Sequence, residues 1–393
     1  MRDVYRIKFS GVMDADGHIL EPPDLWERYL EPRFRDRALR ICTDDDGLEY
    51  LEIGGKPSLL SRKGFPGTLG AMGKMHVEDV RPNPERTYLA GAPHGSMDMK
   101  QRLERLDAEN LEAAVLYPTI GILWEAELDD AELSDAYCRA YNRWIADFCR
   151  DSAGRLVPIA HVSLSDPAAA ARELERAVRD GCRGAFVVPF TWSHLPHGHQ
   201  DHDPLFAAAQ ALDVPLALHP AFEPPAIAST RFTLQRKTRL LASVTAADGV
   251  RHAFTTLFDF GVFDRFPRLK IVVLESGAGW IGYWLDRLDA VYGSTFIGER
   301  VPLAEKPSHY FKTRCWISSD PVERTIPALI ERLGADRFFW ASDYPHADHT
   351  ASYMREVEEL AGLLAAPARQ RFLGENVREL YNVEVRAQAK RDA

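Results

Sequence analysis

Short apolar runs that predict β-strands alternate with amphipathic stretches that predict helices along most of this chain. Runs rich in β-branched and other apolar residues predict strands over residues 11–16, 111–118, 155–164, 182–189, 214–220, 269–276, 314–319 and 336–343. Helical periodicity between them predicts helices over residues 130–151, 166–181, 203–212 and 321–334. Eight such strands in one chain predict an α/β fold, a (β/α)8 TIM barrel, whose active site lies at the C-terminal ends of the strands.

Residues 34–95 interrupt this alternation after the first strand. The sequence ICTDDDGLEYLEIGG predicts a hairpin around the turn Asp46-Gly47, and a Gly- and Pro-rich stretch follows it. We interpret the segment as an insertion in a single domain that spans residues 1–393 and ends in a helical extension. Because the insertion leaves the barrel at the face of the predicted active site, we expect a lid, a subunit contact or a packed excursion without a role in the chemistry.

The composition is that of an ordinary globular protein, with 46% hydrophobic residues, 27% charged residues and a net charge of −10. Acidic and basic residues are mixed along the chain, so no basic stripe favours nucleic acid or an anionic membrane. No run approaches the roughly 20 apolar residues of a membrane span, and the first residues lack the apolar run of a signal peptide, so we expect a cytoplasmic protein. The five cysteines form no C-x-x-C pair and are expected to be reduced thiols in the core.

Five polar residues fall at the ends of predicted strands, which the barrel would bring to one rim. Asp16 and His18 end the first strand, and His219, Glu275 and Asp343 end the fifth, sixth and eighth strands. Since positions i and i+2 of a strand point the same way, Asp16 and His18 can hold one cation between them. Mixed nitrogen and carboxylate-oxygen ligands suit Zn, Mn or Fe, so the sequence predicts a divalent metal at the barrel mouth.

Five stretches carry a resemblance to a known family: DADGHILEPPDLW, LALHP, GVFDRFPRLKIVVLESGAGWIGYWLDRLD, FFWASDYPH and RFLGENVRELYNV. Through them the chain resembles the amidohydrolase superfamily, in the branch that includes aminocarboxymuconate-semialdehyde decarboxylase and the resorcylate decarboxylases. The resemblance implies a metal-dependent enzyme whose divalent ion is held by Asp16, His18, His219 and Asp343. Family members usually carry His-x-His or Glu-x-His at the first ligand pair, so an aspartate takes the first position here.

Position 275 departs from the family, because the well-known decarboxylases carry a histidine there that takes part in proton transfer, whereas this chain carries Glu275. A carboxylate can act as an acid or base when its surroundings raise its pKa, or it can bind a metal. Glu275 together with Glu21 and His252 would suffice for a second ion beside the first. The alternatives are that Glu21 caps the helix in the stretch PPDLWERYL that follows it and that His252 lies on a solvated helix face.

Three functions remain open at this point. The first is hydrolysis or non-oxidative decarboxylation of a small carboxylated or aromatic substrate at one divalent ion, with Asp343, Glu275 and His346 as catalytic side chains. The second is an O2-dependent oxygenase with a dinuclear iron or Fe/Mn site on the same fold. The third is a barrel that serves as a non-catalytic partner subunit.

Other aromatic and histidine residues carry a weaker signal. A planar substrate would suit four aromatic residues near the predicted loops, although aromatic residues there are more often core: Trp26, Phe190, Trp192 and Trp280. A histidine-rich loop matches no helix or strand face and is interpreted as a polar loop rather than a metal site: His194, His197, His199 and His202. His161 is expected to be a satisfied interior histidine of the barrel wall, and a homodimer is the expected assembly.

Overall fold

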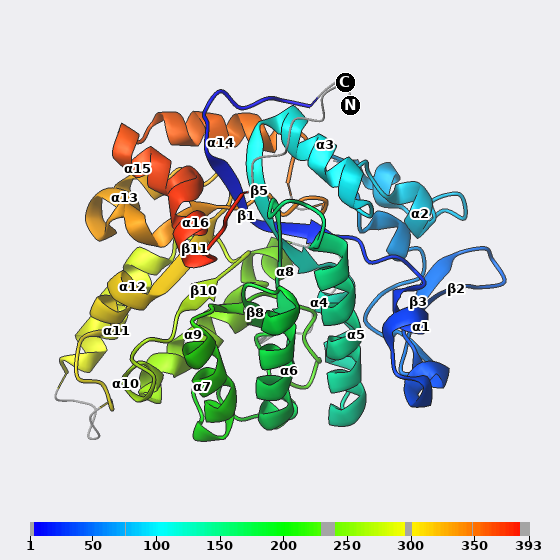
Figure 1. The fold of residues 1–393 in the computed structure, drawn as a ribbon, viewed down its shortest axis with the longest axis horizontal. Helices are drawn as coiled ribbons and strands as arrows, with labels where there is room; N and C mark the ends of the chain where they lie inside the picture. Colours follow the sequence, from blue (N-terminus) through cyan, green and yellow to red (C-terminus); the bar gives the residue numbers. More distant parts are fainter. Residues whose placement is uncertain (1–3, 75, 229–239, 295–300, 348, 386–393) are drawn as a thin grey trace.

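The computed structural model describes residues 4–74, 76–228, 240–294, 301–347 and 349–385, in which parallel strands alternate with helices (Figure 1). The parallel strands are β1 (Val12–Ile19), β5 (Leu111–Pro118), β6 (Leu156–Pro158), β7 (Ala160–His161), β8 (Ala185–Val187), β9 (Leu216–Leu218), β10 (Ile271–Val273), β11 (Cys315–Ser319) and β12 (Phe338–Trp340). They pair in the orders β1-β5-β6 and β12-β11-β10-β9-β8-β7, and each of these pairs is parallel. The predicted α/β class with its (β/α)8 arrangement is confirmed.

Backbone contacts join the two sets of strands. Asp343 N donates to Asp16 O at 2.9 Å and His18 N donates to Tyr344 O at 2.7 Å, so β1 lies beside the segment that follows β12. On the other side, only Ile159 separates β6 from β7. The strand predicted at 155–164 is divided there because its first part pairs with β5 and its second part pairs with β8.

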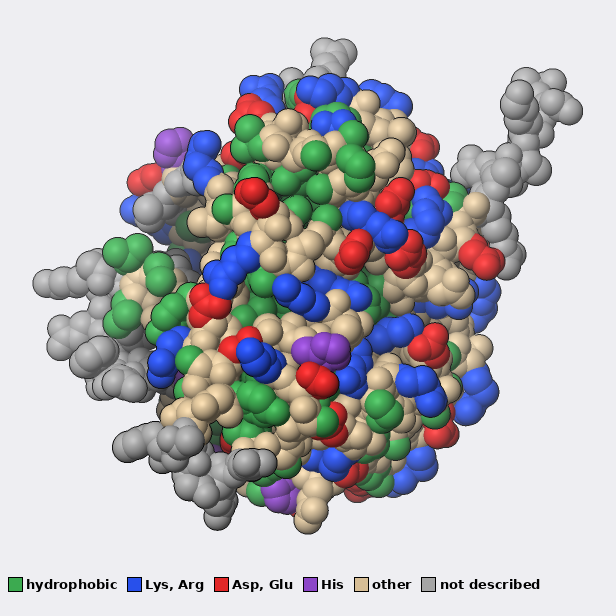
Figure 2. Space-filling view, turned by 90° about the vertical axis from the view of Figure 1, so that its left-hand side faces the viewer, with side chains coloured by type: hydrophobic (Ala, Val, Ile, Leu, Met, Phe, Trp, Pro, Cys, Tyr) green, Lys and Arg blue, Asp and Glu red, His purple; other side chains and the backbone are tan. Residues whose placement is uncertain are grey.

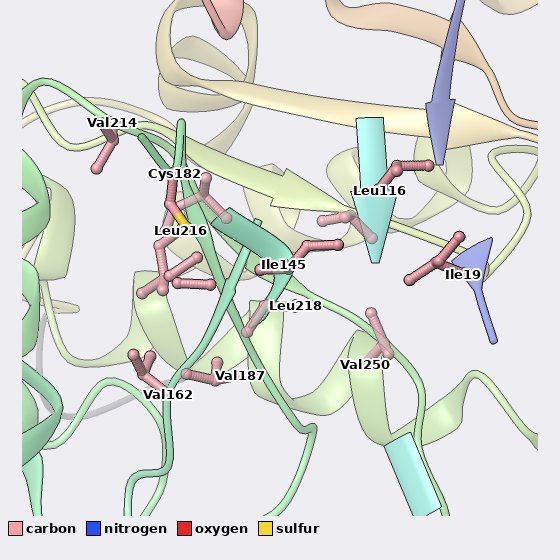
Figure 3. Close-up of a cluster of buried hydrophobic side chains, with 14 of the residues drawn as sticks. Ile19, Leu116, Ile145, Val162, Cys182, Val187, Val214, Leu216, Leu218 and Val250 are labelled. Atoms are coloured by element: carbon pink, nitrogen blue, oxygen red, sulfur yellow. The ribbon is translucent and has the colours of Figure 1, made fainter. Parts of the chain in front are cut away.

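Alternate residues of the strands pack on the two faces of the wall, as the period of a strand requires. Ala15, Val115 and Phe186 belong to the cluster of buried side chains inside the barrel. Leu116 and Val187, their chain neighbours, belong to a second cluster between the strands and the helices, part of which Figure 3 shows. Cys138, Cys149, Cys182 and Cys315 are buried, Cys42 is half-buried, and no two cysteines are paired, in agreement with the expected core thiols.

The longer helices cover the outside of the strands and are α5 (Ala131–Cys149), α6 (Pro167–Asp180), α7 (Asp203–Leu212), α9 (Asp248–Asp259), α11 (Ile281–Tyr292), α12 (Pro307–Arg314) and α13 (Ile326–Leu333). The helices predicted at 130–151, 166–181 and 203–212 are confirmed, whereas the helix predicted at 321–334 begins only at Ile326. The preceding turn stays outside α13, since the Glu323 carboxylate accepts hydrogen bonds from the backbone N–H groups of Ala278, Gly279 and Asp320. Shorter elements in the connections are α4 (Gly121–Trp124), η4 (Glu125–Glu127), η5 (Gln200–His202), α8 (Leu240–Thr245), α10 (Val262–Arg265) and η6 (Ala335–Arg337).

The segment between β1 and β5 contains the predicted hairpin. Its elements are α1 (Leu25–Tyr29), η1 (Pro32–Arg37), β2 (Arg40–Thr43), β3 (Glu49–Ile53), β4 (Lys56–Pro57), η2 (Pro66–Thr68), η3 (Val77–Val80), α2 (Tyr88–Gly91) and α3 (Met99–Glu109). β2 and β3 pair antiparallel around Asp44, whose carboxylate accepts hydrogen bonds from Asp46 N and Leu48 N. Gly47 in that turn has a φ of +78°, which favours glycine.

The C-terminal residues form α14 (Tyr353–Gly362), α15 (Ala366–Gln370), a π-turn at Arg371–Glu375 and α16 (Asn376–Leu380). Val377, Leu380 and Tyr381 join the cluster inside the barrel. Gly374 packs so closely on Gly11, just before β1, that a Cβ there would lie 1.9 Å from Gly11 O. The helical extension therefore covers the N-terminal end of the strands, opposite the predicted active site.

The molecular surface shows no concentration of one charge on the face drawn in Figure 2, where Lys and Arg side chains alternate with Asp and Glu side chains. The expectation that the chain binds no nucleic acid stays a prediction. Within the residues that the structure describes, no helix has the length and apolar character needed to cross a membrane. The expected homodimer stays a prediction.

Candidate metal centre

Two overlapping groups of candidate metal ligands lie at the C-terminal ends of the strands. Asp16 and His18 of β1 form one group with His219 after β9 and Glu275 after β10; in this group one ligand atom of each residue lies within 4.8 Å of all the others. A second group, with the same spread, consists of His18, Glu275, Asp343 and His346. Residues that are far apart in the sequence therefore converge on one point at the mouth of the barrel.

The two imidazoles point their Nε2 atoms at that point. His18 Nδ1 lies 2.8 Å from Pro118 O and His219 Nδ1 lies 2.7 Å from Pro220 O, so each Nδ1 is placed to donate to a carbonyl. This arrangement leaves the Nε2 lone pairs for a ligand. The two Nε2 atoms are 3.3 Å apart.

The carboxylates surround the two Nε2 atoms. Glu275 Oε2 lies 3.1 Å from His219 Nε2, and Asp343 Oδ1 lies 3.4 Å from His18 Nε2. Asp16 contributes one oxygen 3.6 Å from His18 Nε2 and the other 3.7 Å from His219 Nε2. Asp16 is fully buried, whereas 22% of the Glu275 side chain is exposed, so the site opens to solvent on the side of Glu275.

These side chains fit a divalent cation. Both oxygens of Asp16 and Oε2 of Glu275 are buried and accept no hydrogen bond from the part of the chain that the structure describes. Burying a carboxylate without a partner is costly, so a cation among these atoms would remove that cost. Imidazole nitrogen together with carboxylate oxygen is a ligand set suited to a transition metal.

The electrostatics of the site lead to the same conclusion. Burial raises the pKa of Asp16 to about 6 and lowers the pKa of His18 well below its ordinary value. Burial also lowers the pKa of His219, but the carboxylates of Asp16 and Glu275 outweigh it and raise this pKa well above its ordinary value. A divalent cation would favour the ionised carboxylates and the neutral imidazoles that its coordination requires.

Asp343 and His346 form a second pair of interacting groups beside the first. His346 Nδ1 lies 2.7 Å from Asp343 Oδ1, and His346 Nε2 lies 2.9 Å from the Thr119 hydroxyl. Asp343 and Glu275 both adopt positive φ values, +52° and +39°, at the point where their strands have ended. Such conformations are costly for residues other than glycine and cluster at functional sites.

The structure does not bring Glu21 and His252 into either group. Glu21 Oε2 accepts hydrogen bonds from Thr119 N at 3.3 Å and Ile120 N at 2.9 Å, and Oε1 accepts one from Gly121 N at 2.9 Å. The carboxylate therefore caps α4. The alternative interpretation from the sequence, a cap for the helix that directly follows Glu21, was wrong about the helix, since Asp24 is the N-cap residue of α1. His252 lies exposed on α9, as its own alternative interpretation stated.

The aromatic residues considered for a planar substrate fall into two sets. Phe190 belongs to the cluster inside the barrel and Trp192 packs against it. Trp192 Nε1 donates a hydrogen bond to Glu125 O. Trp26 and Trp280 pack in the cluster outside the strands, so they are core residues of the helical layer.

The other histidines named from the sequence lie outside the two ligand groups, and His161 Nδ1 has no hydrogen-bond partner among the described residues. His161 is fully buried inside the barrel, stacked on Phe186, with its Nε2 2.9 Å from Glu125 Oε2, which confirms it as an interior histidine. His197 and His202 are buried and contact the carbonyls of Val188 and His197. His194, His199 and their neighbours in this loop form no metal-ligand group among the described residues.

Residues 58–73, which we call the strap, connect the loops around the mouth. At one end Leu59 N, Leu60 N and the Ser58 hydroxyl all donate to the Glu127 carboxylate in the loop after β5. At the other end Met72 N donates to Pro345 O and Gly73 N donates to His349 O in the loop after β12. Between these ends the ring of Phe65 lies 5.8 Å from that of Phe222, in the loop after β9.

Sequence reasoning missed Thr119 and the buried residues behind the ligands, Asp14, Arg102 and Ser342. Thr119 directly follows β5, so the signal that identified the other site residues, a polar residue at a strand end, was present. Arg102 lies on α3, more than 80 residues from the nearest ligand in the sequence, and no pattern connects it with β1.

Comparison with known proteins gives consistent results. The family model described as Amidohydrolase matches residues 111–383, which is more than half of the chain. The gamma-resorcylate decarboxylase of Rhizobium radiobacter is 28% identical over 314 residues, which cover 76% of this chain and 92% of that protein.

Two solved structures share the fold. An amidohydrolase from Mycobacterium avium subsp. paratuberculosis aligns with a TM-score of 0.76 and 22% identity, over 95% of this chain and 99% of that one. The 5-carboxyvanillate decarboxylase of Novosphingobium aromaticivorans, in complex with manganese and 4-hydroxy-3-methoxy-5-nitrobenzoic acid, aligns with a TM-score of 0.68 and 21% identity, over 97% of this chain and 99% of that one.

Proposed function

Because this chain belongs to the amidohydrolase family, we propose that it is a metal-dependent decarboxylase that removes CO2 from a small aromatic acid without oxidation. The observation that carries the proposal is the convergence of three imidazoles and three carboxylates, in two overlapping groups, at the ends of the barrel strands. The chain is similar to resorcylate and carboxyvanillate decarboxylases, and this similarity favours decarboxylation over hydrolysis as its reaction.

A divalent ion would be held by Asp16, His18, His219 and Asp343, with Glu275 as a further ligand. Glu275 Oε2 is nearer to His219 Nε2 than any other carboxylate oxygen of the site, which favours coordination by Glu275 over a role remote from the ion. Manganese is bound in the similar carboxyvanillate decarboxylase and suits an oxygen-rich ligand set. A divalent ion held here would act as a Lewis acid on the oxygens of the substrate carboxylate.

Asp343 supplies the proton that the reaction consumes. The proton adds to the ring carbon that bears the carboxylate, the bond between this carbon and the carboxylate breaks, its electron pair returns to the ring and CO2 leaves. His346 contacts Asp343 at 2.7 Å and returns a proton to it, while the Thr119 hydroxyl holds the imidazole from the other side. The reaction is redox-neutral and takes one proton from water in each turnover.

Phe190, Trp192 and Phe222 bind the ring of the substrate. Phe190 is buried in the cluster inside the barrel, and Trp192 and Phe222 are partly buried against it. Flat apolar surfaces of this kind favour a planar ring.

The oxygenase alternative has no support, because neither Glu21 nor His252 lies in the ligand groups and the similar proteins named above are decarboxylases and an amidohydrolase. We therefore expect one ion for each chain.

The test is CO2 release by the purified protein loaded with manganese, with 2,6-dihydroxybenzoate and 5-carboxyvanillate as probe substrates. In D2O the product should carry one deuterium at the carbon that lost CO2. Asp343→Asn should lower kcat by about 10²–10⁴-fold, as the loss of a general acid does. His252→Gln, at an exposed position of α9, is the matched control and should retain full activity. Undiminished CO2 release by Asp343→Asn would overturn the mechanism. If the wild-type protein hydrolysed amides or esters and released no CO2, the proposed function would be a hydrolase instead of a decarboxylase.

A further inference from the structure

A buried pair of opposite charges lies directly behind the metal ligands. Asp14 of β1 and Arg102 of α3 are 2% and 1% exposed, and neither belongs to a ligand group. A Cβ on Gly17, between the ligands Asp16 and His18, would lie 2.6 Å from Asp14 Oδ2 and 2.7 Å from Arg102 Nη2. The two charges therefore meet at the backbone of Gly17, and only glycine leaves room for both.

Asp14 bonds to the backbone beside two ligands. Its Oδ1 accepts hydrogen bonds from Asp16 N at 3.3 Å and from Ser342 N at 2.9 Å, and its Oδ2 accepts one from the Ser342 hydroxyl at 2.6 Å. The same Ser342 hydroxyl accepts a hydrogen bond from Tyr344 N at 2.9 Å. One carboxylate thus fixes Asp16 and both residues that flank Asp343.

Arg102 donates a hydrogen bond to the backbone of the ligand His18. Its Nη1 donates to His18 O at 3.0 Å, and its guanidinium lies over the Tyr344 ring at 4.7 Å from the ring centre. His18 N donates to Tyr344 O and Asp343 N donates to Asp16 O, so the same strip of backbone carries direct bonds between the ligand segments. We call residues 14–18 with residues 342–344 the seam.

The contacts of the seam are more specific than barrel closure alone requires. Two buried opposite charges are weak evidence for stability, because desolvation offsets much of the attraction between them. Here both charges are directed at the backbone atoms of residues that carry or flank Asp16, His18 and Asp343. Groups outside the coordination sphere that orient ligands in this way typically change metal affinity 10–100-fold.

We propose that Asp14 and Arg102, with Ser342, are positioning residues that hold Asp16, His18 and Asp343 at the spacing a divalent ion needs. The inference rests on the metal site of the proposed function but not on its reaction. It predicts that the seam determines metal affinity and coordination geometry in protein that is already folded.

The test measures metal binding in the full-length protein. Asp14→Ala removes all three accepted bonds, Ser342→Ala removes only the hydroxyl contacts, and Arg102→Lys keeps the charge but loses the planar group over Tyr344. The dissociation constant for Mn²⁺ comes from competition with a chelator, and the visible absorption of bound Co²⁺ reports the coordination geometry. We expect Asp14→Ala to weaken Mn²⁺ binding by about 10–100-fold and to shift the Co²⁺ spectrum, with smaller effects for the other two variants. Asp14→Asn, which can still accept from Ser342 N and donate to its hydroxyl, should recover part of the affinity.

Glu173→Gln is the matched control. Glu173 on α6 is a buried carboxylate that accepts from Asn142 Nδ2 and Arg176 and has no contact with the seam. It should lower stability without changing the Mn²⁺ constant or the Co²⁺ spectrum.

If Asp14→Ala does not fold, Ser342→Ala and Arg102→Lys decide the question. Wild-type Mn²⁺ affinity and an unchanged Co²⁺ spectrum in folded seam variants would overturn the inference, as would an equal loss in Glu173→Gln. A wild-type protein that binds Mn²⁺ but releases no CO2 would contradict the proposed function and leave this inference to be judged on metal binding alone.

Discussion

Mutation of Glu21 distinguishes most clearly between a structural carboxylate and a metal ligand. It follows β1 directly, within three residues of His18, and its sequence position allowed either role. In the structure it is fully buried, and its two oxygens accept three backbone N–H groups at the start of α4. The replacement Glu21→Ala leaves these three buried donors without an acceptor.

The expected cost follows from the number of donors. A buried polar group that loses its partner costs about 1–3 kcal/mol, so the three donors left by Glu21→Ala should lower the free energy of unfolding by about 3–9 kcal/mol. Glu21→Gln keeps the size and one good acceptor but turns an NH2 group toward backbone donors, and should cost about 1–3 kcal/mol. Glu27→Gln is the control, because Glu27 is exposed and bonds only to Arg40 among the contacts described, which predicts a loss below about 1 kcal/mol.

Urea unfolding of the three variants measures these losses, and elemental analysis of each folded protein measures its metal content. We expect Glu21→Ala to lose the most stability, Glu21→Gln less and the control Glu27→Gln the least. Each of the three variants should bind one ion for each chain. If Glu21→Gln lost bound metal and kept wild-type stability, the capping role would be refuted and the second-ion hypothesis would return.

Three further predictions concern other parts of the molecule. Burial lowers the pKa of His197 to about 4 from its ordinary 6.5, so the neutral imidazole stabilises the fold fully above pH 6.5. This contribution of about 3 kcal/mol is lost as the pH falls through 4. Urea unfolding of the wild type at pH 7 and pH 4 should show this loss of stability, and His197→Gln should largely lack it. Glu127→Gln weakens the anchor of the strap at Ser58, Leu59 and Leu60, so KM for an aromatic acid should rise about 3–10-fold with little change in Mn²⁺ affinity, and an unchanged KM would remove the strap from substrate binding. Glu275→Gln should weaken Mn²⁺ binding at least about 10-fold in the chelator competition, whereas full affinity would return Glu275 to a role without coordination.

The fold and the ligand positions were accessible from the sequence for a physical reason. Parallel strands bring their C-terminal ends to one rim, so polar residues that end separate strands must lie together. This argument needs no knowledge of side-chain contacts, and it located Asp16, His18, His219, Glu275 and Asp343, which the structure brings within two small groups.

Side-chain direction was not accessible in the same way. Glu21 lies as near to the ligands in the sequence as any second-ion candidate, but its carboxylate turns to the N–H groups of α4, a short helix that only the folded chain places there. The helix predicted from residue 321 begins at Ile326 because the Glu323 carboxylate bonds to the backbone of residues about 45 positions earlier. Contacts of this range carry no periodic signal.

Glu275 is the residue that most changes the chemistry that we expected from the resemblance of this chain to its family. Glu275 brings the number of carboxylates in the two ligand groups to three, so their negative charges outnumber the two positive charges of a divalent cation. Carboxylate oxygens favour harder ions such as manganese over ions that prefer nitrogen ligands. A carboxylate on the solvent side of the site also repels a second carboxylate, so an aromatic acid must bring its charge directly onto the ion rather than beside it. The same glutamate that strengthens the hold on the ion therefore restricts where the substrate carboxylate can bind.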